Sequence, residues 1–263
     1  MAIKSNLDMI DEERAAACTG IFKLPSAGRL YGDNFPETLE IQAFGFAVED
    51  VLTQSIPALK KFLKITDDVV KNLPERFNRE LFLAGDVFAI VAVARGLTYG
   101  QDYRFKVVCP ECDTPEIVTI KVPAELPIIS WEGKSLAELQ ESWTVLLPIA
   151  RDSVKVRPLT IAEELSVSDS IRVAAASGSD ASSGVYTMAA HIREVNGGAP
   201  DTLMEAVSYV RKLRGDDMTA LQQVVADCSP GIKIKYDMLC DKCSNKYSTS
   251  IPLSADFFRR NRV

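Results

Sequence analysis

Histidine is nearly absent from this chain, with His191 the one histidine in 263 residues. A catalytic triad uses a histidine as its base. Metal centres built from several histidines are excluded, because the chain has a single one. His191 falls within the helical pattern 186–194. We expect a partly buried helix residue there rather than a base or a ligand, because no second histidine can join it.

Motifs of common catalysts are also missing. The chain has no phosphate-binding Gly-x-x-x-x-Gly-Lys-Ser/Thr loop, no Gly-x-Gly-x-x-Gly, no Gly-x-Ser-x-Gly and no His-Glu-x-x-His. Three acidic pairs remain, at predicted helix starts, where carboxylates favour the helix dipole. They are Asp67-Asp68, Glu163-Glu164 and Asp216-Asp217. We therefore expect a protein that is not an enzyme, with no catalytic residue and no small-molecule substrate.

Long hydrophobic runs and an excess of positive charge are absent as well. The longest apolar run, 87–94, is too short to span a bilayer. The first twenty residues are acidic and lack the apolar core of a secretory signal. A net charge of −6 and a pI of about 5.1 provide no long-range field for nucleic acid or an anionic membrane. These features are typical of a soluble protein of a reducing cytoplasm, without a membrane partner.

Four of the six cysteines form two Cys-x-x-Cys pairs, Cys109/Cys112 and Cys240/Cys243. Two residues between cysteines let both thiolates of a turn bind one ion, and two such turns complete a tetrahedral Cys₄ zinc site. The 127 residues between the pairs far exceed the roughly 15–20 of a simple zinc ribbon. The sequence therefore predicts a structural Zn²⁺ that joins distant parts of the chain.

Each pair lies between runs patterned as β-strands: 103–108 and 117–122 for the first, 232–236 and 247–251 for the second. A thioredoxin-like redox motif would instead stand at a strand-to-helix junction. Disulfides, or reduced cysteines without a ligand role, would also be compatible with the spacing. Cys18 and Cys228 stand alone and are expected to be small, buried, apolar side chains.

Helical and strand-like patterns together predict an α+β fold. Capping boxes at Thr160/Glu163 and Thr202/Glu205 mark two helix starts. Strand patterns cover 39–44 and 154–159. Helical spacing covers 49–64 and 66–96, broken near Pro57 and Pro74, and then 161–176, 185–194, 202–213 and 217–227.

The two halves of the chain follow a similar plan, which predicts an internal duplication. Cys109 to Cys240 is an offset of 131 positions, and Leu24-Pro25 to Leu147-Pro148 is one of 123. Each half would be a strand and helical unit ending in a knuckle, and the two knuckles would share one zinc. Chance similarity of short apolar patterns is the alternative. The expected divisions are an N-terminal segment 1–21, a first half 22–122, a linker 123–144, a second half 145–253 and a tail 254–263.

Two segments are candidate contact surfaces. Residues 27–36 combine glycines with Arg29, Tyr31 and Phe35, a mix that suits either a binding loop or an ordinary surface loop. The tail has Phe257 and Phe258 before three arginines. Exposure of these two aromatic side chains to water would cost free energy, so we expect them to dock on this protein or on a neighbour. The alternative is a frayed polar tail.

Several short motifs resemble one family. They are Leu24-Pro-Ser-Ala-Gly-Arg-Leu-Tyr31, Asp86 with the apolar run to Arg95 and Thr98-Tyr-Gly100, Cys109-Pro-Glu-Cys112, Val156-Arg-Pro-Leu-Thr160 with Glu163, and Asp256-Phe-Phe258. Together they resemble the T4-type baseplate proteins of contractile-tailed bacteriophages, the group of baseplate hub subunits and hub-assembly factors. The resemblance implies a non-enzymatic baseplate protein, a virion part or an assembly factor, whose partners are other tail proteins in the host cytoplasm or the virion.

The alternative function is a zinc-ribbon accessory factor that binds nucleic acid. The second knuckle favours it, with Lys233, Lys235, Tyr236, Lys242, Lys246 and Tyr247. The acidic total and the first knuckle's Glu111, Asp113 and Glu116 oppose it. We therefore do not expect nucleic acid as a partner.

Overall fold

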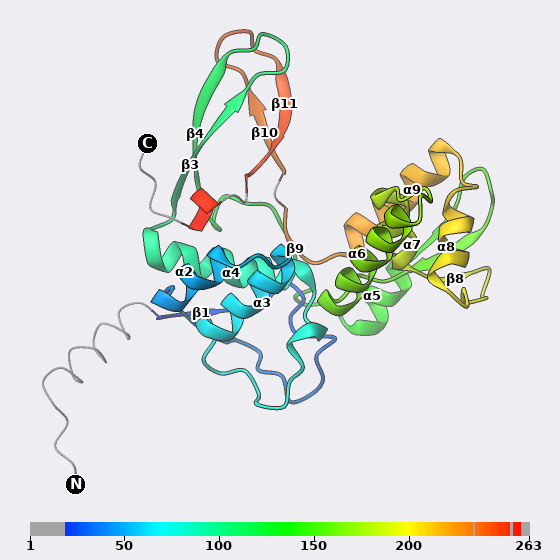
Figure 1. Cartoon of the computed structure of the whole chain (residues 1–263), viewed down its shortest axis with the longest axis horizontal. Helices are drawn as coiled ribbons and strands as arrows, with labels where there is room; N and C mark the ends of the chain where they lie inside the picture. The colour runs from blue at the N-terminus through cyan, green and yellow to red at the C-terminus, as the bar shows by residue number, and fades with distance from the viewer. Residues whose placement is uncertain (1–18, 234, 253–254, 259–263) are drawn as a thin grey trace, which may run out of the picture.

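A long two-hairpin arm projects from a helical body, and a second helical lobe lies beside that body in the computed structural model (Figure 1). The structure describes residues 19–233, 235–252 and 255–258. Small antiparallel sheets and helices alternate along the chain, which confirms a mixed α and β fold. No helix in these ranges has the length and apolar character needed to cross a membrane.

The body is built around one helix, α4 (Ala84–Tyr99). Nearly every side chain between positions 86 and 95 is buried, so α4 is surrounded on all sides and its sequence shows almost no amphipathic period. The elements that pack against it include β1 (Thr19–Phe22), β2 (Leu39–Gln42) and α3 (Ala58–Val69). α2 (Phe46–Thr53) packs on α3, and the 3₁₀ turn η1 (Arg79–Leu81) contacts α6 (Ile161–Ala176). β1 and β2 pair in antiparallel fashion, and β1 includes residues 19–21, which the sequence pattern assigns to the N-terminal segment.

The lobe combines five helices with a three-stranded antiparallel sheet. Its helices are α5 (Leu136–Ser142), α6 (Ile161–Ala176), α7 (Ser183–His191), α8 (Leu203–Val210) and α9 (Gly215–Cys228). α7 contacts the sheet and three of the other helices, α6, α8 and α9. Its sheet has the order β6 (Thr144–Leu146), β7 (Ser153–Val156) and β8 (Ile192–Val195). The segment 123–144, expected to be a linker, contains α5 and two buried tryptophans, Trp131 and Trp143, whose rings lie 5.4 Å apart.

The arm consists of two antiparallel hairpins that rise together from the body (Figure 1). The first is β3 (Asp102–Val108) with β4 (Pro115–Lys121), and the second is β10 (Lys235–Leu239) with β11 (Lys246–Ser250). Tyr103, Phe105 and Val107 of β3 are buried while the residues between them are exposed. This period of two gives the first hairpin one inner and one outer face.

A two-stranded pairing returns the chain from the lobe to the arm. β9 (Gly231–Ile232) pairs with β5 (Ile128–Ile129) and crosses the first turn of α4 at Gly85. A Cβ on Gly85 would lie 2.0 Å from the Pro230 carbonyl oxygen, and one on Gly231 would lie 2.6 Å from the Gly85 Cα. Only glycines allow these two backbones to touch.

Several expected helix bounds were wrong. The expected break between 64 and 66 does not occur, because α3 continues to Val69; the segment 70–83 that follows it is not helical apart from η1. Asp67 and Asp68 consequently stand at the end of α3 and not at a helix start. α7 ends at His191, where the chain enters β8. The breaks at Pro57 and Pro74 are confirmed, as are the capping box Thr160/Glu163 and the cap at Thr202.

Candidate metal centre

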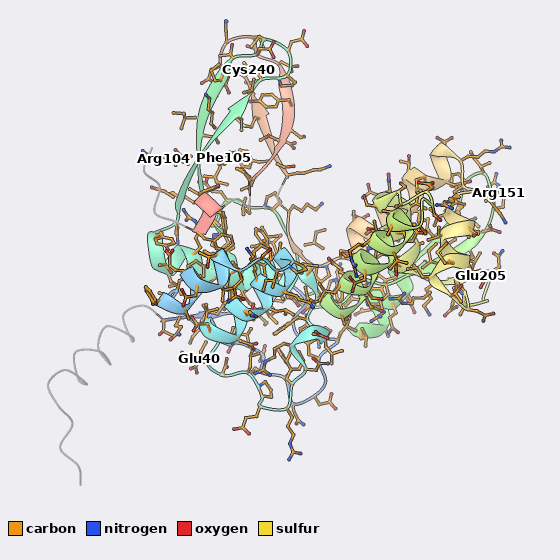
Figure 2. All side chains as sticks on the ribbon, in the orientation of Figure 1. Glu40, Arg104, Phe105, Arg151, Glu205 and Cys240 are labelled. Carbon is orange, nitrogen blue, oxygen red and sulfur yellow. The ribbon has the colours of Figure 1, made fainter. Side chains whose placement is uncertain are left out.

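All four predicted ligand cysteines meet at the end of the arm. The sulfur atoms of Cys109, Cys112, Cys240 and Cys243 all lie within 4.8 Å of one another. The first pair comes from the β3–β4 turn and the second from the β10–β11 turn (Figure 2 labels Cys240). Two cysteine pairs with 127 residues between them are therefore brought to one point.

The spacing of the sulfur atoms suits one tetrahedral ion. Four thiolates about 2.3 Å from a central Zn²⁺ stand about 3.8 Å apart. The contacts Cys109–Cys243 and Cys112–Cys240 are both 3.6 Å, and both join one hairpin to the other. An ion held there would bind both hairpins at once. The four cysteines can thus hold a metal ion.

The two knuckles share their backbone geometry. In the first, the Cys109 amide donates to the Thr114 carbonyl and the Asp113 amide to the Cys109 carbonyl, both at 3.0 Å. In the second, Cys240 donates to Asn245 at 3.0 Å and Ser244 to Cys240 at 2.9 Å.

The residue after the second cysteine is left-handed in both turns, with φ of 52° at Asp113 and 56° at Ser244. These hydrogen bonds and this residue fold the backbone back, so the two cysteines of each turn face the same point.

Neighbouring polar groups stabilise the pair of turns. Glu116 of β4 accepts the Asp241 amide at 3.1 Å, which links the hairpins beside the sulfur atoms. The Thr114 hydroxyl lies 3.2 Å from the Cys112 sulfur and lowers the pKa of Cys112 to about 6. A metal needs deprotonated thiols, and this contact favours that form at Cys112. The pKa values of Cys240 and Cys243 are raised instead, with desolvation and neighbouring side chains as the raising causes. Cys228 is buried in α9, where burial raises its pKa to about 11, and Cys18 lies outside the described residues.

A second pair of equivalent contacts, which the sequence reasoning missed, anchors each half. Asp86, the third residue of α4, is buried and accepts the Ser26 amide at 3.0 Å. Asp217, the third residue of α9, is buried and accepts the Ile149 amide at 2.7 Å. Both amides follow a Leu-Pro pair. Each carboxylate therefore ties a Leu-Pro turn to the helix that precedes a knuckle hairpin.

The candidate contact loop turns its aromatic residues inward. Tyr31 is buried and donates to Asp86 at 2.5 Å. Its hydroxyl also accepts the Leu83 amide at 2.9 Å. Phe35 packs on Tyr31 and on Phe77 and Phe82. The two rings of 27–36 therefore pack on the core and are not displayed for a partner, while a binding role for the loop stays a prediction.

The phenylalanines of the tail dock on this protein itself. Phe257 and Phe258 are buried in the 3₁₀ turn η2 (Ala255–Phe258). The Arg95 guanidinium, buried in α4, donates to the Phe257 carbonyl at 3.0 Å and lies over the Phe257 ring. The arginines at 259, 260 and 262 lie outside the described residues.

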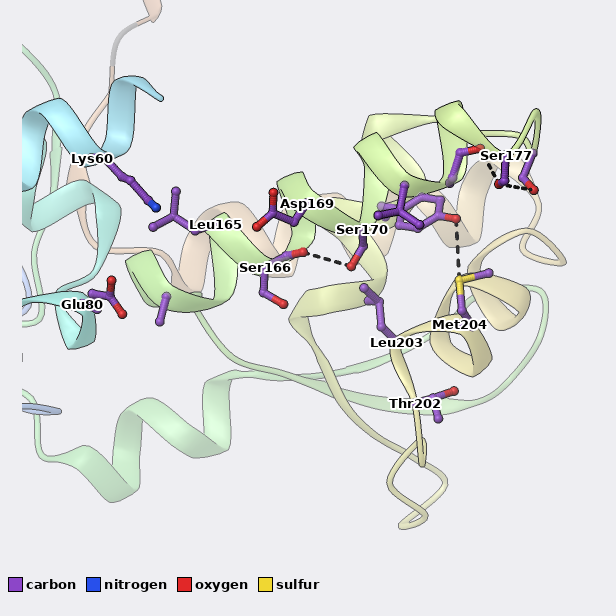
Figure 3. Close-up of a pocket in the computed structure, with 15 residues that line it drawn as sticks. Lys60, Glu80, Leu165, Ser166, Asp169, Ser170, Ser177, Thr202, Leu203 and Met204 are labelled. Carbon is purple, nitrogen blue, oxygen red and sulfur yellow. Dashed lines mark hydrogen bonds between the residues drawn. The ribbon is translucent and has the colours of Figure 1, made fainter. Parts of the chain in front are cut away.

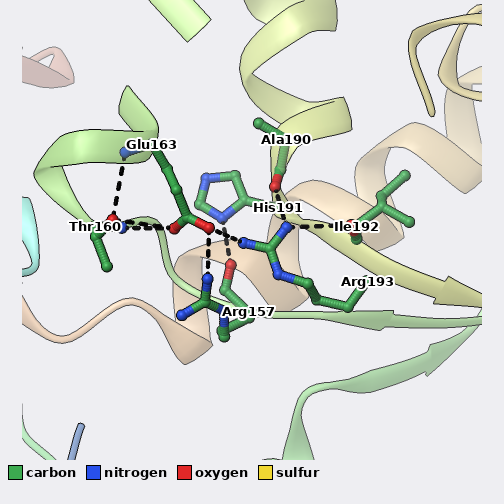
Figure 4. A network of polar contacts seen from close by, with 7 residues as sticks. All are labelled: Arg157, Thr160, Glu163, Ala190, His191, Ile192 and Arg193. Carbon is green, nitrogen blue, oxygen red and sulfur yellow. Dashed lines mark hydrogen bonds and ion pairs between the residues drawn. The ribbon is translucent and has the colours of Figure 1, made fainter. Parts of the chain in front are cut away.

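His191 and Glu163 belong to a structural network (Figure 4). Glu163 pairs with Arg157 at 2.5 Å and with Arg193 at 2.8 Å while it caps α6 through Thr160. The His191 Nδ1 lies 2.8 Å from the Arg157 carbonyl, and burial lowers the pKa of this histidine. The network joins α6, α7 and β8.

A large groove runs along α6 and α8 (Figure 3). Its volume is about 860 Å³, and Leu165, Val173, Leu203 and Met204 provide its apolar lining. Its polar side chains include four serines, together with Lys60, Glu80 and Asp169, and Asp169 is paired with Arg172. Its lining lacks histidine and cysteine, so the metal centre and this groove are separate features.

No protein-family model, curated protein or solved structure matches this chain. Its function therefore has to be inferred from its own residues and geometry.

Proposed function

We propose that the four thiolates hold one structural Zn²⁺ that closes the arm. Tetrahedral sulfur sites select zinc or iron, and zinc is the usual ion of two paired Cys-x-x-Cys turns. Bound there, the ion would contribute folding free energy, on the order of 10 kcal/mol in small zinc domains. Four cysteine ligands leave no open coordination position for a substrate, so the role we assign to this ion is structural.

We also propose that the chain arose by internal duplication. The offset of 131 positions relates the starts of α4 and α9, the clamps Asp86 and Asp217, and the two knuckles. It relates the hairpin registers too, since Val108 pairs with Pro115 and Leu239 with Lys246. Agreement of the acceptor carboxylates, the turn geometry and the register at this offset supports duplication over a chance similarity of short apolar patterns, and the amide donors Ser26 and Ile149 stand 123 positions apart.

We propose that the protein is a non-enzymatic structural or assembly component of a bacteriophage tail baseplate, in its hub or wedge region. The single observation that carries the interaction role is the arm, whose two hairpins converge on four cysteines at its end (Figure 1). A projecting element closed by a metal suits a rigid contact platform. The residues that resemble baseplate proteins also form long-range contacts here: Tyr31 with Asp86, and Phe257 with Arg95.

The experiment is quantitative mass spectrometry of purified virions and of infected-cell lysate from the phage that encodes the chain. A fixed small ratio to the tail-tube protein in virions would support a baseplate component. Abundance in lysate and in tail-assembly intermediates, with absence from virions, would support an assembly factor. Absence from both virions and tail intermediates would contradict the proposal.

A further inference from the structure

The outer face of the first hairpin combines unpaired cations with exposed aliphatic side chains. Arg104 and Lys106 of β3 are exposed, and neither forms an ion pair within the described ranges (Figure 2). Ile117, directly opposite Lys106, is 64% exposed, and Val108 is 54% exposed. We call this set, completed by Thr119 and Lys121, the outer arm face.

The positive charge of this face is opposite in sign to the net charge of the chain. The whole chain carries −6, whereas the outer arm face has three cations, with Asp102 opposite Lys121 at its base. The acidic residues of the first knuckle are elsewhere: Glu111 and Asp113 are at the end of the arm, and Glu116 bonds to the second hairpin. The face therefore complements an acidic partner.

The aromatic residues of the arm decide which kind of acidic partner fits. Tyr103 and Phe105 are buried on the inner face, and Tyr236 and Tyr247 alternate with the exposed residues of the second hairpin. Single-stranded nucleic acid binds through bases stacked on exposed aromatics. Ile117, Val108 and the Thr119 methyl offer aliphatic contacts instead, which suit protein side chains.

We propose that the outer arm face docks an acidic protein segment whose acidic side chains alternate with aliphatic ones. Glutamates or aspartates would pair with Arg104 and Lys106, and aliphatic side chains would cover Ile117 and Val108. This inference deepens the proposed protein–protein role of the chain. The docking proposal makes no use of the baseplate assignment. The peptide-binding test can therefore fail while the virion measurement succeeds, and it can succeed while the virion measurement fails.

The test is fluorescence anisotropy of the full zinc-loaded chain with defined probes: a synthetic peptide of alternating Glu and Val, its Lys and Val counterpart, and an oligothymidylate. We expect the acidic peptide alone to bind. The double variant R104E/K106E should weaken that binding at least about tenfold. The matched double variant K71E/R76E, which makes the same charge change at exposed positions in the body, should weaken it less than about twofold.

Two further variants separate docking from general charge attraction. Ile117→Ser should weaken the Glu-Val peptide about threefold or more and leave binding of polyglutamate unchanged, because it removes apolar contact and no charge. If R104E/K106E lowers the zinc content of the protein, the double variant R104Q/K106Q replaces it in the test. R104Q/K106Q removes the two positive charges without introducing negative ones. Failure of the acidic peptide to bind at low salt, or an equal loss with K71E/R76E, would overturn the proposal. So would tighter binding of oligothymidylate that R104E/K106E abolishes.

Discussion

Asp86 and Asp217 hold the same place in the two halves of the chain. Each is the third residue of a helix, each is buried, and each accepts a backbone amide that follows a Leu-Pro pair. The helix in question leads in both cases toward a hairpin that carries two of the four cysteines. A carboxylate in the first turn also interacts favourably with the positive end of the helix dipole. These two clamps fix the bases from which the two cysteine turns reach each other.

Asp217→Ala should therefore lower the free energy of unfolding by about 1–3 kcal/mol, because the amides of Ile149 and Ala150 would lose their charged acceptor. Urea denaturation measures this loss. The matched control is Asp216→Ala at the exposed neighbouring position, expected within about 0.5 kcal/mol of the parent. Equal effects of the two substitutions would show that Asp217 is no clamp.

Gly85→Ala should destabilise the protein by at least about 2 kcal/mol, since the new methyl group would meet the Pro230 carbonyl, which belongs to the backbone and cannot rotate away. Gly184→Ala in α7 is the control, because nothing lies within 4 Å of its added Cβ and alanine favours a helix. Thermal denaturation compares the two variants. A Gly85→Ala protein as stable as the parent would mean that β9 and α4 are not in contact.

Glu164 should make stability depend on pH. It lines a cavity of about 540 Å³, with His191, Lys233 and Lys235, and burial raises its pKa from 4.5 to about 7. A carboxyl with a raised pKa binds its proton more tightly in the folded state. Its stabilising contribution is complete below about pH 4.5 and is lost as the pH rises through about 7.

Glu164→Gln removes this titration. Between pH 5 and pH 8 the parent should lose on the order of 1–2 kcal/mol of unfolding free energy relative to the variant. Urea denaturation at both pH values measures the difference, with Glu141→Gln at an exposed position of the lobe as control. A constant difference between parent and Glu164→Gln across this range would rule out a titrating buried Glu164.

The sequence predicted that the four cysteines would meet, because two Cys-x-x-Cys pairs are the ligand spacing typical of one metal site. It also predicted both strands of the first hairpin and β11 of the second, where residues alternate in burial. The strand expected at 232–236 was misplaced, because β10 runs from Lys235 to Leu239. The bounds of α4 were harder to predict, because a helix buried on all sides has no polar face and so no period that marks its ends. Periodicity therefore extended the helical prediction across 70–83, which is mostly irregular.

Tertiary contacts explain the remaining differences. Tyr31 and Phe35 stand in a glycine-rich loop, and only the contact with Asp86, fifty-five positions away, shows that the loop faces the core. The clamps themselves were within reach of the sequence, since the offset of 131 that relates the cysteine pairs also relates Asp86 to Asp217. The role of these two carboxylates could not be predicted from the sequence. Among 36 acidic residues, they are distinguished by their burial, which only the structure shows.

The central claim is that two hairpins from distant parts of the chain share one metal ion. Native mass spectrometry of the protein, expressed with zinc in the medium, tests it most directly. We predict one zinc per chain, lost in Cys109→Ser and equally in Cys240→Ser, because each removes a ligand from the same ion. Two zinc ions per chain, none, or one that persists in either variant would contradict a shared site.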